Sequence, residues 1–160
     1  MRLQIVAVGR MKSGPETELF ARYEDRASKA GRQLGLSAVS RREFAESRLP
    51  RAQARRDEEA SALLGALSPG AVAIALDERG EDIDSAAFAA LLRSHLDGGT
   101  SELAFLIGGP DGHGEAALTV ARKTIRFGRL TWPHQIVRIL LAEQIYRAIT
   151  ILTGHPYHRE

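Results

Sequence analysis

Short apolar runs alternate with longer amphipathic stretches along the chain, and this alternation constrains the fold more than any other feature. The runs Leu3–Val8, Ala71–Leu76 and Leu103–Ile107 are typical of buried strands. Leu36–Val39 and Thr124–Leu130 indicate two weaker strands. Strands that alternate with helices predict a mainly parallel sheet flanked by helices on both faces, an α/β fold.

Proline, acidic residues and glycine mark the ends of the predicted helices. Pro15-Glu16 places proline and a carboxylate in a first helical turn, where both are favoured. Gly35 and Gly154 follow helical stretches, as glycine often does at helix ends. With 160 residues, the chain predicts one domain spanning 1–160. The expected helices cover about Pro15–Leu34, Pro50–Ala66, Asp84–Leu96, Glu115–Lys123 and Pro133–Thr153.

The composition excludes several classes of protein. The chain has no cysteine, which excludes a disulfide scaffold, a thiolate zinc site, an iron–sulfur cluster and a cysteine nucleophile. No apolar run reaches the roughly 20 residues that a membrane helix needs. The first nine residues resemble a strand and not a signal peptide, so we expect a cytoplasmic protein without membrane contact.

The charge distribution is compatible with an RNA partner without requiring one. Net charge is +2, but the first 75 residues carry 13 basic against 9 acidic side chains. All basic residues except Lys12, Lys29 and Lys123 are arginines. Arginine suits bidentate phosphate contacts, although a GC-rich genome gives the same bias.

A glycine-rich turn follows the strand Leu103–Ile107. Its glycines at 108, 109, 112 and 114 match neither G-x-G-x-x-G nor the phosphate loop that ends in G-K-[ST]. A dinucleotide or triphosphate ligand is therefore unsupported. Either a flat ligand approaches this exposed backbone closely, or the turn is only a tight strand-to-helix connection. Ligands of open α/β sheets bind at the carboxyl ends of strands, which makes the segments after Leu76, Ile107 and Leu130 the candidates.

The last predicted helix carries more apolar residues than one stripe can hold. The surplus indicates a two-fold dimer through this helix, unless the helix is enclosed within its own chain. Among its polar residues, Glu143 and Arg147 stand four apart and are able to pair. Alternatively, Arg138 or Arg147 contacts RNA phosphate.

The C-terminal segment from Gly154 to Glu160 is dense in functional side chains. His158 is a candidate base near neutral pH, Tyr157 a stacking platform for a nucleobase and Arg159 a phosphate contact. His155 and His158 lack a third ligand at useful spacing, so no metal is expected. His95 and His113 are interpreted as ordinary surface histidines.

Four motifs in order give the chain a resemblance to a known family. It resembles the RlmH family of ribosomal RNA large-subunit methyltransferases, of the SPOUT class, over essentially its whole length. Trp132 and the pair Phe127-Gly128 depart from the residues usual there. The motifs are Phe105–Gly112, Leu130–Arg138, Glu143–Ala148 and His155–Glu160.

The resemblance implies a homodimer, a SPOUT-type α/β fold with a C-terminal trefoil knot, and S-adenosylmethionine as methyl donor. It implies N3 of a pseudouridine in large-subunit (23S) ribosomal RNA as the acceptor. A partner subunit's tail is expected to complete the site, with His158 as base, Tyr157 and Arg159 positioning the nucleotide, and His134 as the other candidate base. The cofactor contacts that it implies are Leu76, Gly108, Phe127, Gly128, Arg129, Leu130, Thr131 and Trp132.

The near-neutral charge predicts weak binding to free RNA, so the expected substrate is the assembled ribosome. Three other functions stay open at this point. They are SPOUT methylation of transfer RNA, a non-enzymatic ribosome-associated factor, and a flavodoxin-like or response-regulator-like domain. Gly9-Arg10-Met11-Lys12 after the first strand lacks the acidic cluster of a phosphoacceptor.

Overall fold

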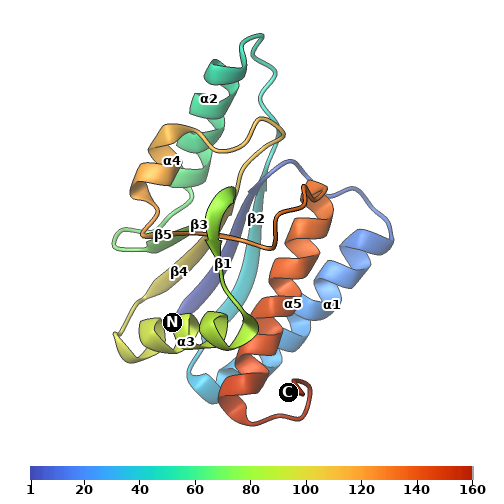
Figure 1. The fold of residues 1–160 in the computed structure, drawn as a ribbon, viewed down its shortest axis with the longest axis vertical. Helices are drawn as coiled ribbons and strands as arrows, with labels where there is room; N and C mark the ends of the chain where they lie inside the picture. Colours follow the sequence, from blue (N-terminus) through green and yellow to red (C-terminus); the bar gives the residue numbers. More distant parts are fainter. Residues whose placement is uncertain (160) are drawn as a thin grey trace.

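A computed structural model describes residues 1–159 and has a five-stranded parallel sheet at its centre (Figure 1). The strand order is β2-β1-β4-β3-β5, and β4 in the middle is buried along its whole length. The sheet confirms the predicted α/β class and its parallel arrangement. The strands are Arg2–Val8 (β1), Ala38–Phe44 (β2), Val72–Asp82 (β3), Glu102–Ile107 (β4) and Lys123–Arg126 (β5).

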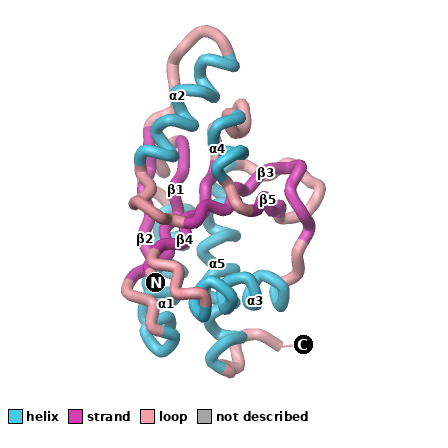
Figure 2. The backbone as a smooth tube through the Cα atoms, turned by 90° about the vertical axis from the view of Figure 1, so that its left-hand side faces the viewer, coloured by secondary structure: helices cyan, strands magenta, loops and turns pink. Residues whose placement is uncertain are grey.

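Helices cover both faces of the sheet, as the alternation predicts. Side chains alternate along β1, so Ile5 packs with α1, α3 and α5, whereas Val6 packs with α2 and α4. Figures 1 and 2 show α2 and α4 side by side, and α1 beside α5 in Figure 1. The helices are Pro15–Gly31 (α1), Ala52–Gly65 (α2), Ser85–Asp97 (α3), Glu115–Val120 (α4) and His134–Thr153 (α5), with a 3-10 turn η1 at Arg32–Leu34.

The second strand lies later in the chain than its apolar pattern predicts. The expected strand was Leu36–Val39, but β2 covers Ala38–Phe44 and only Val39 in it is buried. β2 is an edge strand that pairs with β1 alone. An edge strand needs little apolar surface, so β2 contains polar residues and its sequence shows no apolar run.

The elements before the last helix are shorter than predicted. α4 ends at Val120, not near Lys123, because Ala121 adopts an extended conformation and the Arg122 N–H donates to the carbonyl of Ala73 at 2.8 Å. The strand expected at Thr124–Leu130 is β5, which stops at Arg126. The residues from Phe127 to Pro133 therefore form a loop at the end of the sheet.

α5 lies against α1 and α3, and these helices cover much of the apolar surface that predicted a dimer. Ile139, Leu141, Ile145 and Ile149 are buried within the chain. Ile136, Leu140 and Ile151 are only half-buried. No helix in residues 1–159, α5 included, is long and apolar enough to cross a bilayer. The trefoil knot stays a prediction.

The side-chain cap at the start of α3 gives a first test of the fold. Asp84 accepts a hydrogen bond from the Ala87 N–H at 2.7 Å. Replacing Asp84 with alanine is expected to lower the free energy of unfolding by about 1 kcal/mol, because one amide at the helix start loses its partner. Urea denaturation measures this. Asp97→Ala, at the opposite end of α3, is the control and should cost less than about 0.5 kcal/mol.

Candidate active site

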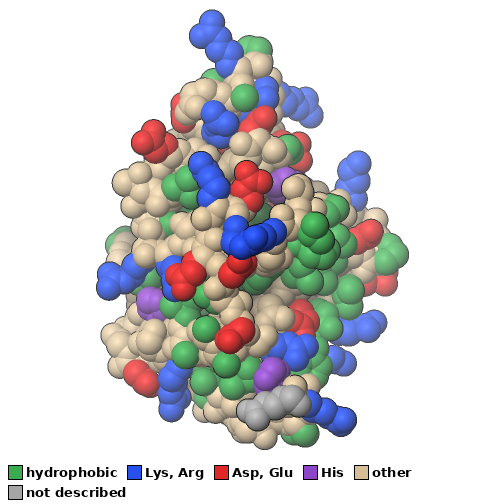
Figure 3. All heavy atoms as spheres, in the orientation of Figure 1, with side chains coloured by type: hydrophobic (Ala, Val, Ile, Leu, Met, Phe, Trp, Pro, Cys, Tyr) green, Lys and Arg blue, Asp and Glu red, His purple; other side chains and the backbone are tan. Residues whose placement is uncertain are grey.

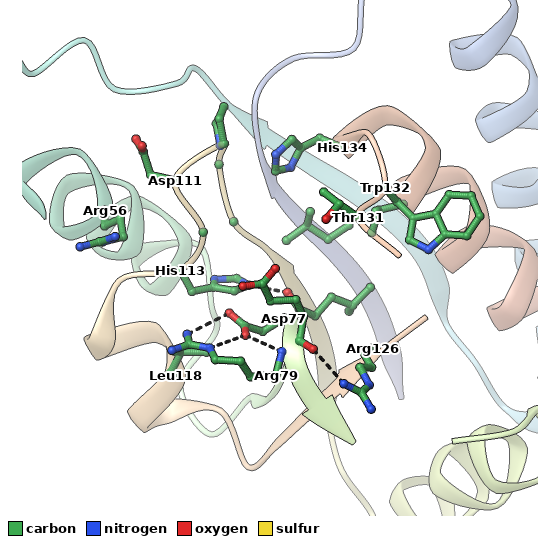
Figure 4. A pocket seen from close by; sticks show the side chains of 18 of the residues that line it. Arg56, Asp77, Arg79, Asp111, His113, Leu118, Arg126, Thr131, Trp132 and His134 are labelled. Atoms are coloured by element: carbon green, nitrogen blue, oxygen red, sulfur yellow. Dashed lines mark hydrogen bonds and ion pairs between the residues drawn. The ribbon is translucent and has the colours of Figure 1, made fainter. Parts of the chain in front are cut away.

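A cavity of about 740 Å³ opens at the carboxyl end of β4 and beside Leu76–Arg79, where β3 stops pairing with β4 and continues to Asp82, six residues beyond the predicted strand (Figure 4). Its walls come from this segment of β3, the glycine-rich turn after β4, and the loop between β5 and α5. These are the three segments that the strand-end rule selected. The volume is in the range that suits a small-molecule ligand.

Most of the predicted cofactor contacts lie in the wall of this cavity. Leu76 and Gly108 line it from the strand ends. Of the residues from Phe127 to Trp132, all line it except Arg129, which is exposed to solvent. The Trp132 indole donates a hydrogen bond to the carbonyl of Phe127 at 2.8 Å, which closes the loop on itself.

The glycine turn is packed too tightly for side chains. A Cβ on Gly108 would lie 2.9 Å from the backbone of Gly112, and one on Gly109 would lie 2.4 Å from a carboxylate oxygen of Glu59. These contacts are with the protein's own atoms, so they favour the interpretation of the turn as a tight strand-to-helix connection. Gly108, Gly109 and Gly112 also line the cavity, and close approach of a flat ligand to their backbone stays a prediction.

A bidentate ion pair ties the outer side of the turn to α2. Arg55 Nε and Nη2 lie 2.6 and 3.1 Å from the two carboxylate oxygens of Asp111. The hydrogen bond from Arg55 lowers the pKa of Asp111. Arg55 also donates to the carbonyls of Leu49 and Pro50, so the same guanidinium connects the loop before α2 with the glycine turn.

His113 is not a surface residue, contrary to the prediction from sequence. It is 7% exposed, lines the cavity, and its Nε2 lies 3.0 Å from the carbonyl oxygen of Leu76. Burial lowers its pKa, although the Leu76 carbonyl and Asp77 act in the opposite direction. His95, the other histidine assigned to the surface, is half-buried and lies 3.1 Å from the Thr100 hydroxyl.

Paired charges surround the cavity on the β3 side. Arg79 donates to Asp77 at 3.0 Å, and these hydrogen bonds lower the pKa of Asp77 even though burial would raise it. Arg126 donates hydrogen bonds to the carbonyl of Glu78 and to the carboxylate of Asp82, and Figure 4 shows Arg126 at this side of the cavity. The segment after Leu76 is thus held by arginines, and a hydrogen bond from Arg126 lowers the pKa of Asp82 as well.

His134 begins α5 and lines the cavity. Burial is the largest cause that lowers the pKa of His134, and the charge of the Arg138 guanidinium lowers it further. The charges of Glu46 and Glu59 and a hydrogen bond with the Gly108 backbone raise this pKa, but by less. The imidazole is therefore neutral at pH 7 and able to accept a proton. Within residues 1–159, no three acidic or histidine side chains form a group that is able to hold a metal.

Arg138 is buried, so the suggestion that it contacts RNA phosphate is wrong. It is 2% exposed and lies 3.1 Å from Glu43 through Nη1. Arg147 pairs with Glu143, with Nε and Oε1 3.0 Å apart, as the four-residue spacing predicts. Both arginines thus have partners within the chain.

The C-terminal tail packs beside α5, away from the cavity of its own chain (Figure 1). The Tyr157 hydroxyl donates to Glu143 at 3.0 Å, and its ring packs edge-on against Tyr146 at 4.7 Å. His158 Nδ1 lies 3.3 Å from Arg147 Nη1. Arg147 follows Val137, which also lines the cavity, by 10 residues, or about 15 Å along a helix, so the tail does not reach the cavity within one protomer. Burial raises the pKa of Tyr157, and hydrogen bonds with Tyr23 and Glu143 raise it further.

The two histidines of the cavity predict an acid-sensitive fold. Because burial lowers the pKa of both His113 and His134, the unfolded chain takes up protons near pH 6.5 before the folded chain does. The free energy of unfolding is therefore highest above pH 6.5 and falls as the pH drops below it. Urea denaturation at pH 8, 6.5 and 5 measures this. The double variant His113→Gln/His134→Gln should fall less over this range, and an unchanged pH profile would contradict the assignment.

Comparison with known proteins identifies the family. Residues 1–158 match a family model described as predicted SPOUT methyltransferase. Ribosomal RNA large subunit methyltransferase H from Rhizobium leguminosarum bv. trifolii is 54% identical over 159 residues, 99% of each chain. The chain belongs to this family of SPOUT methyltransferases. The proteins of the same name from Brucella anthropi and Agrobacterium fabrum are 54% and 52% identical to it, again over 99% of each chain.

Solved structures support the SPOUT methyltransferase fold. A probable methyltransferase from Bordetella pertussis Tohama I aligns with a TM-score of 0.51 at 18% identity, covering 92% of this chain and 95% of the other. A probable methylase family protein from Haemophilus influenzae Rd KW20 gives 0.54 at 11% identity, covering 99% and 70%. These two structures bear on the fold alone, whereas the family model and the relatives of more than 50% identity confirm the family assignment made from four sequence motifs.

Proposed function

We propose that the protein transfers a methyl group from S-adenosylmethionine to N3 of a pseudouridine in large-subunit ribosomal RNA. The observation that carries this proposal is the cavity, whose walls are the three segments named from the family resemblance. The names of the 54%-identical relatives support ribosomal RNA as the substrate. As one domain in the cytoplasm, the enzyme would meet this RNA in the ribosome.

The residues around the cavity fit S-adenosylmethionine. This donor carries adenosine and a sulfonium but no phosphate, and the glycine turn has no phosphate-loop lysine. Gly108 and Gly109 line the cavity and carry no side chain, so a flat base would be able to approach their backbone. Leu76, Gly108 and the residues from Phe127 to Trp132 would hold the donor, which supplies an already activated methyl group.

The remaining task of the protein is to orient the nucleotide and remove the N3 proton. We propose His158 from the tail of a second copy as the base, with Tyr157 stacking on the nucleotide and Arg159 binding phosphate. His134 is the other candidate, and one observation favours it. It lies in the cavity wall of its own chain with a lowered pKa.

A homodimer is part of this proposal, because the tail contacts Arg147, which lies about 15 Å along α5 from Val137 in the cavity wall. The cavity loop presents apolar side chains to solvent, with Leu130 74% exposed and Trp132 39% exposed. The half-buried residues Ile136, Leu140 and Ile151 add apolar surface along α5. Apolar surface of this kind marks interaction sites.

The surface charge supports an assembled ribosome as substrate. Arg48 and Arg51 are exposed near the start of α2, and Figure 3 shows basic side chains projecting at this end of the molecule. A few such contacts give modest affinity for free RNA, since each neutralised phosphate adds only one released counterion. The shape of the ribosome would supply the remaining contacts.

Two measurements test the proposed function. Calorimetry is expected to detect binding of S-adenosylmethionine to the purified protein. Mass spectrometry of ribosomal RNA should find methylated pseudouridine after incubation with 50S subunits or 70S ribosomes and much less with naked 23S RNA. Absence of donor binding would favour a non-enzymatic ribosome-associated factor, and methylation of transfer RNA alone would make the protein a transfer-RNA enzyme. Comparable turnover on naked 23S RNA would overturn the ribosome requirement.

A further inference from the structure

β3 is irregular in its middle, between Leu76 and Glu81, at the point where it meets the cavity. Its pairing with β4 ends at Leu76 and Ile107. Its pairing with β5 shifts register there, since both Leu76 and Glu81 pair with Ile125. The segment between them leaves the ladder, as in a β-bulge.

His113 provides a partner for the Leu76 carbonyl at this irregular point. Its Nε2 lies 3.0 Å from the Leu76 carbonyl oxygen, so Nε2 carries the proton and donates it. Figure 4 shows the imidazole between the glycine turn and β3. In residues 1–159, this is the one side-chain hydrogen bond between Leu76–Gly80 and Gly108–Gly114.

The second ring nitrogen of His113 indicates that packing alone does not explain why a histidine stands at this position. Nδ1 is buried and has no hydrogen-bond partner. A buried acceptor without a partner costs stability, and an apolar side chain would fill the space without that cost. The contact made by Nε2 is therefore what the histidine contributes.

We infer that His113 is a positioning residue of the donor site, which holds the glycine turn against β3 and fixes the Leu76 peptide group in the cavity wall. Asp111 and Arg55 hold the outer side of the same turn. Without His113, the turn would be tied to α2 but free on the side that faces the donor. This inference rests on the proposed function, because it takes the cavity to be the S-adenosylmethionine site.

Paired substitutions of similar size test the inference. Glutamine places its amide near the position of histidine Nε2, whereas asparagine places its amide near Nδ1 and does not reach Leu76. In calorimetric titrations, His113→Asn and His113→Leu are expected to bind S-adenosylmethionine about tenfold more weakly than the unsubstituted protein. His113→Gln should bind within about twofold of it, and kcat at saturating donor should stay the same for all variants that fold.

The controls separate failure of this inference from failure of the proposed function. If the unsubstituted protein does not bind S-adenosylmethionine, the proposed function fails. If it binds and His113→Asn binds equally well, or if asparagine and glutamine have equal effects, the inference is wrong. A lower kcat with unchanged donor affinity also overturns it. His95→Leu, a half-buried histidine on α3 that does not line the cavity, should leave donor affinity unchanged.

Discussion

Replacing His158 with alanine is expected to slow methyl transfer by about 10²- to 10⁴-fold and to leave the affinity for S-adenosylmethionine unchanged. The reason is that a positioned base contributes this factor, while the tail lies away from the cavity of its own chain. Single-turnover assays on ribosomes measure the rate, and calorimetry measures donor affinity. His155→Ala, an exposed histidine of the same tail, should retain its rate.

The pH dependence of the rate distinguishes His158 from His134. If His158 is the base, His158→Ala should remove the rise in rate with pH that the base causes. His134→Ala should then keep the rise in rate with pH. Full turnover by His158→Ala with an unchanged pH profile would exclude His158 and favour His134.

Mixed dimers test whether the tail acts in the partner's site. One subunit carries His158→Ala, and the other carries Gly108→Ala, whose Cβ would meet the backbone of Gly112 and disturb the donor site. If the tail acts across the dimer, one site has both an intact cavity and an intact tail. Heterodimers purified through two different tags should then recover about half of the unsubstituted activity. If the tail acts within its own chain, both sites are defective and activity stays low.

Local sequence patterns predicted the fold well where burial sets the pattern. The core strands around Ile5, Ile74 and Phe105 are apolar because both faces of a parallel sheet are covered. The apolar pattern does not predict the position of β2, since an edge strand tolerates polar residues such as Arg41 and Arg42. The prediction for α4 is too long, because the Arg122 N–H donates to the Ala73 carbonyl of β3 and not to a carbonyl within the helix, and no local pattern marks that change. The prediction for β5 is too long at its other end, since the strand stops at Arg126.

The candidate site was predictable as far as topology determines it. Carboxyl ends of parallel strands share one edge, which brings Leu76 and Gly108 together without further information. The environment of His113 depends on how the glycine turn folds back onto β3, and no local pattern encodes that contact. The same holds for Arg138, whose charge suggested a surface role until the fold placed Glu43 beside it.

Arg138→Met is expected to lower the free energy of unfolding by about 3–5 kcal/mol, because it leaves a partner charge without its counterion. Arg138 is buried on α5, reaches Glu43 on β2 and donates to the carbonyl of Val8 at the end of β1. Glu43 is largely buried as well. Methionine has a similar length but no donor, so the Glu43 carboxylate loses its counterion, keeping only the Met11 N–H at 3.4 Å, and the Val8 carbonyl loses the guanidinium.

Urea denaturation with two companion variants tests this assignment. Arg93→Met removes an exposed pair with Asp97 on α3 and should cost less than about 1 kcal/mol. The double variant Arg138→Met/Glu43→Leu should regain part of the lost stability, because it removes the unpaired carboxylate too. A loss below about 1 kcal/mol for Arg138→Met alone would show that Glu43 needs no counterion.

The same substitution also connects the stability of this region to the chemistry of the cavity. Arg138 stands one helical turn after His134, and its charge lowers the pKa of that histidine. Removing the charge should therefore raise the pKa of His134, which an NMR titration of the folded variant would detect. The expected consequence is a larger protonated fraction of His134 near pH 6, and with it weaker activity on the acid side if His134 is the base. A change in stability without a change in this pKa would mean that Arg138 supports the fold but not the electrostatics of the cavity.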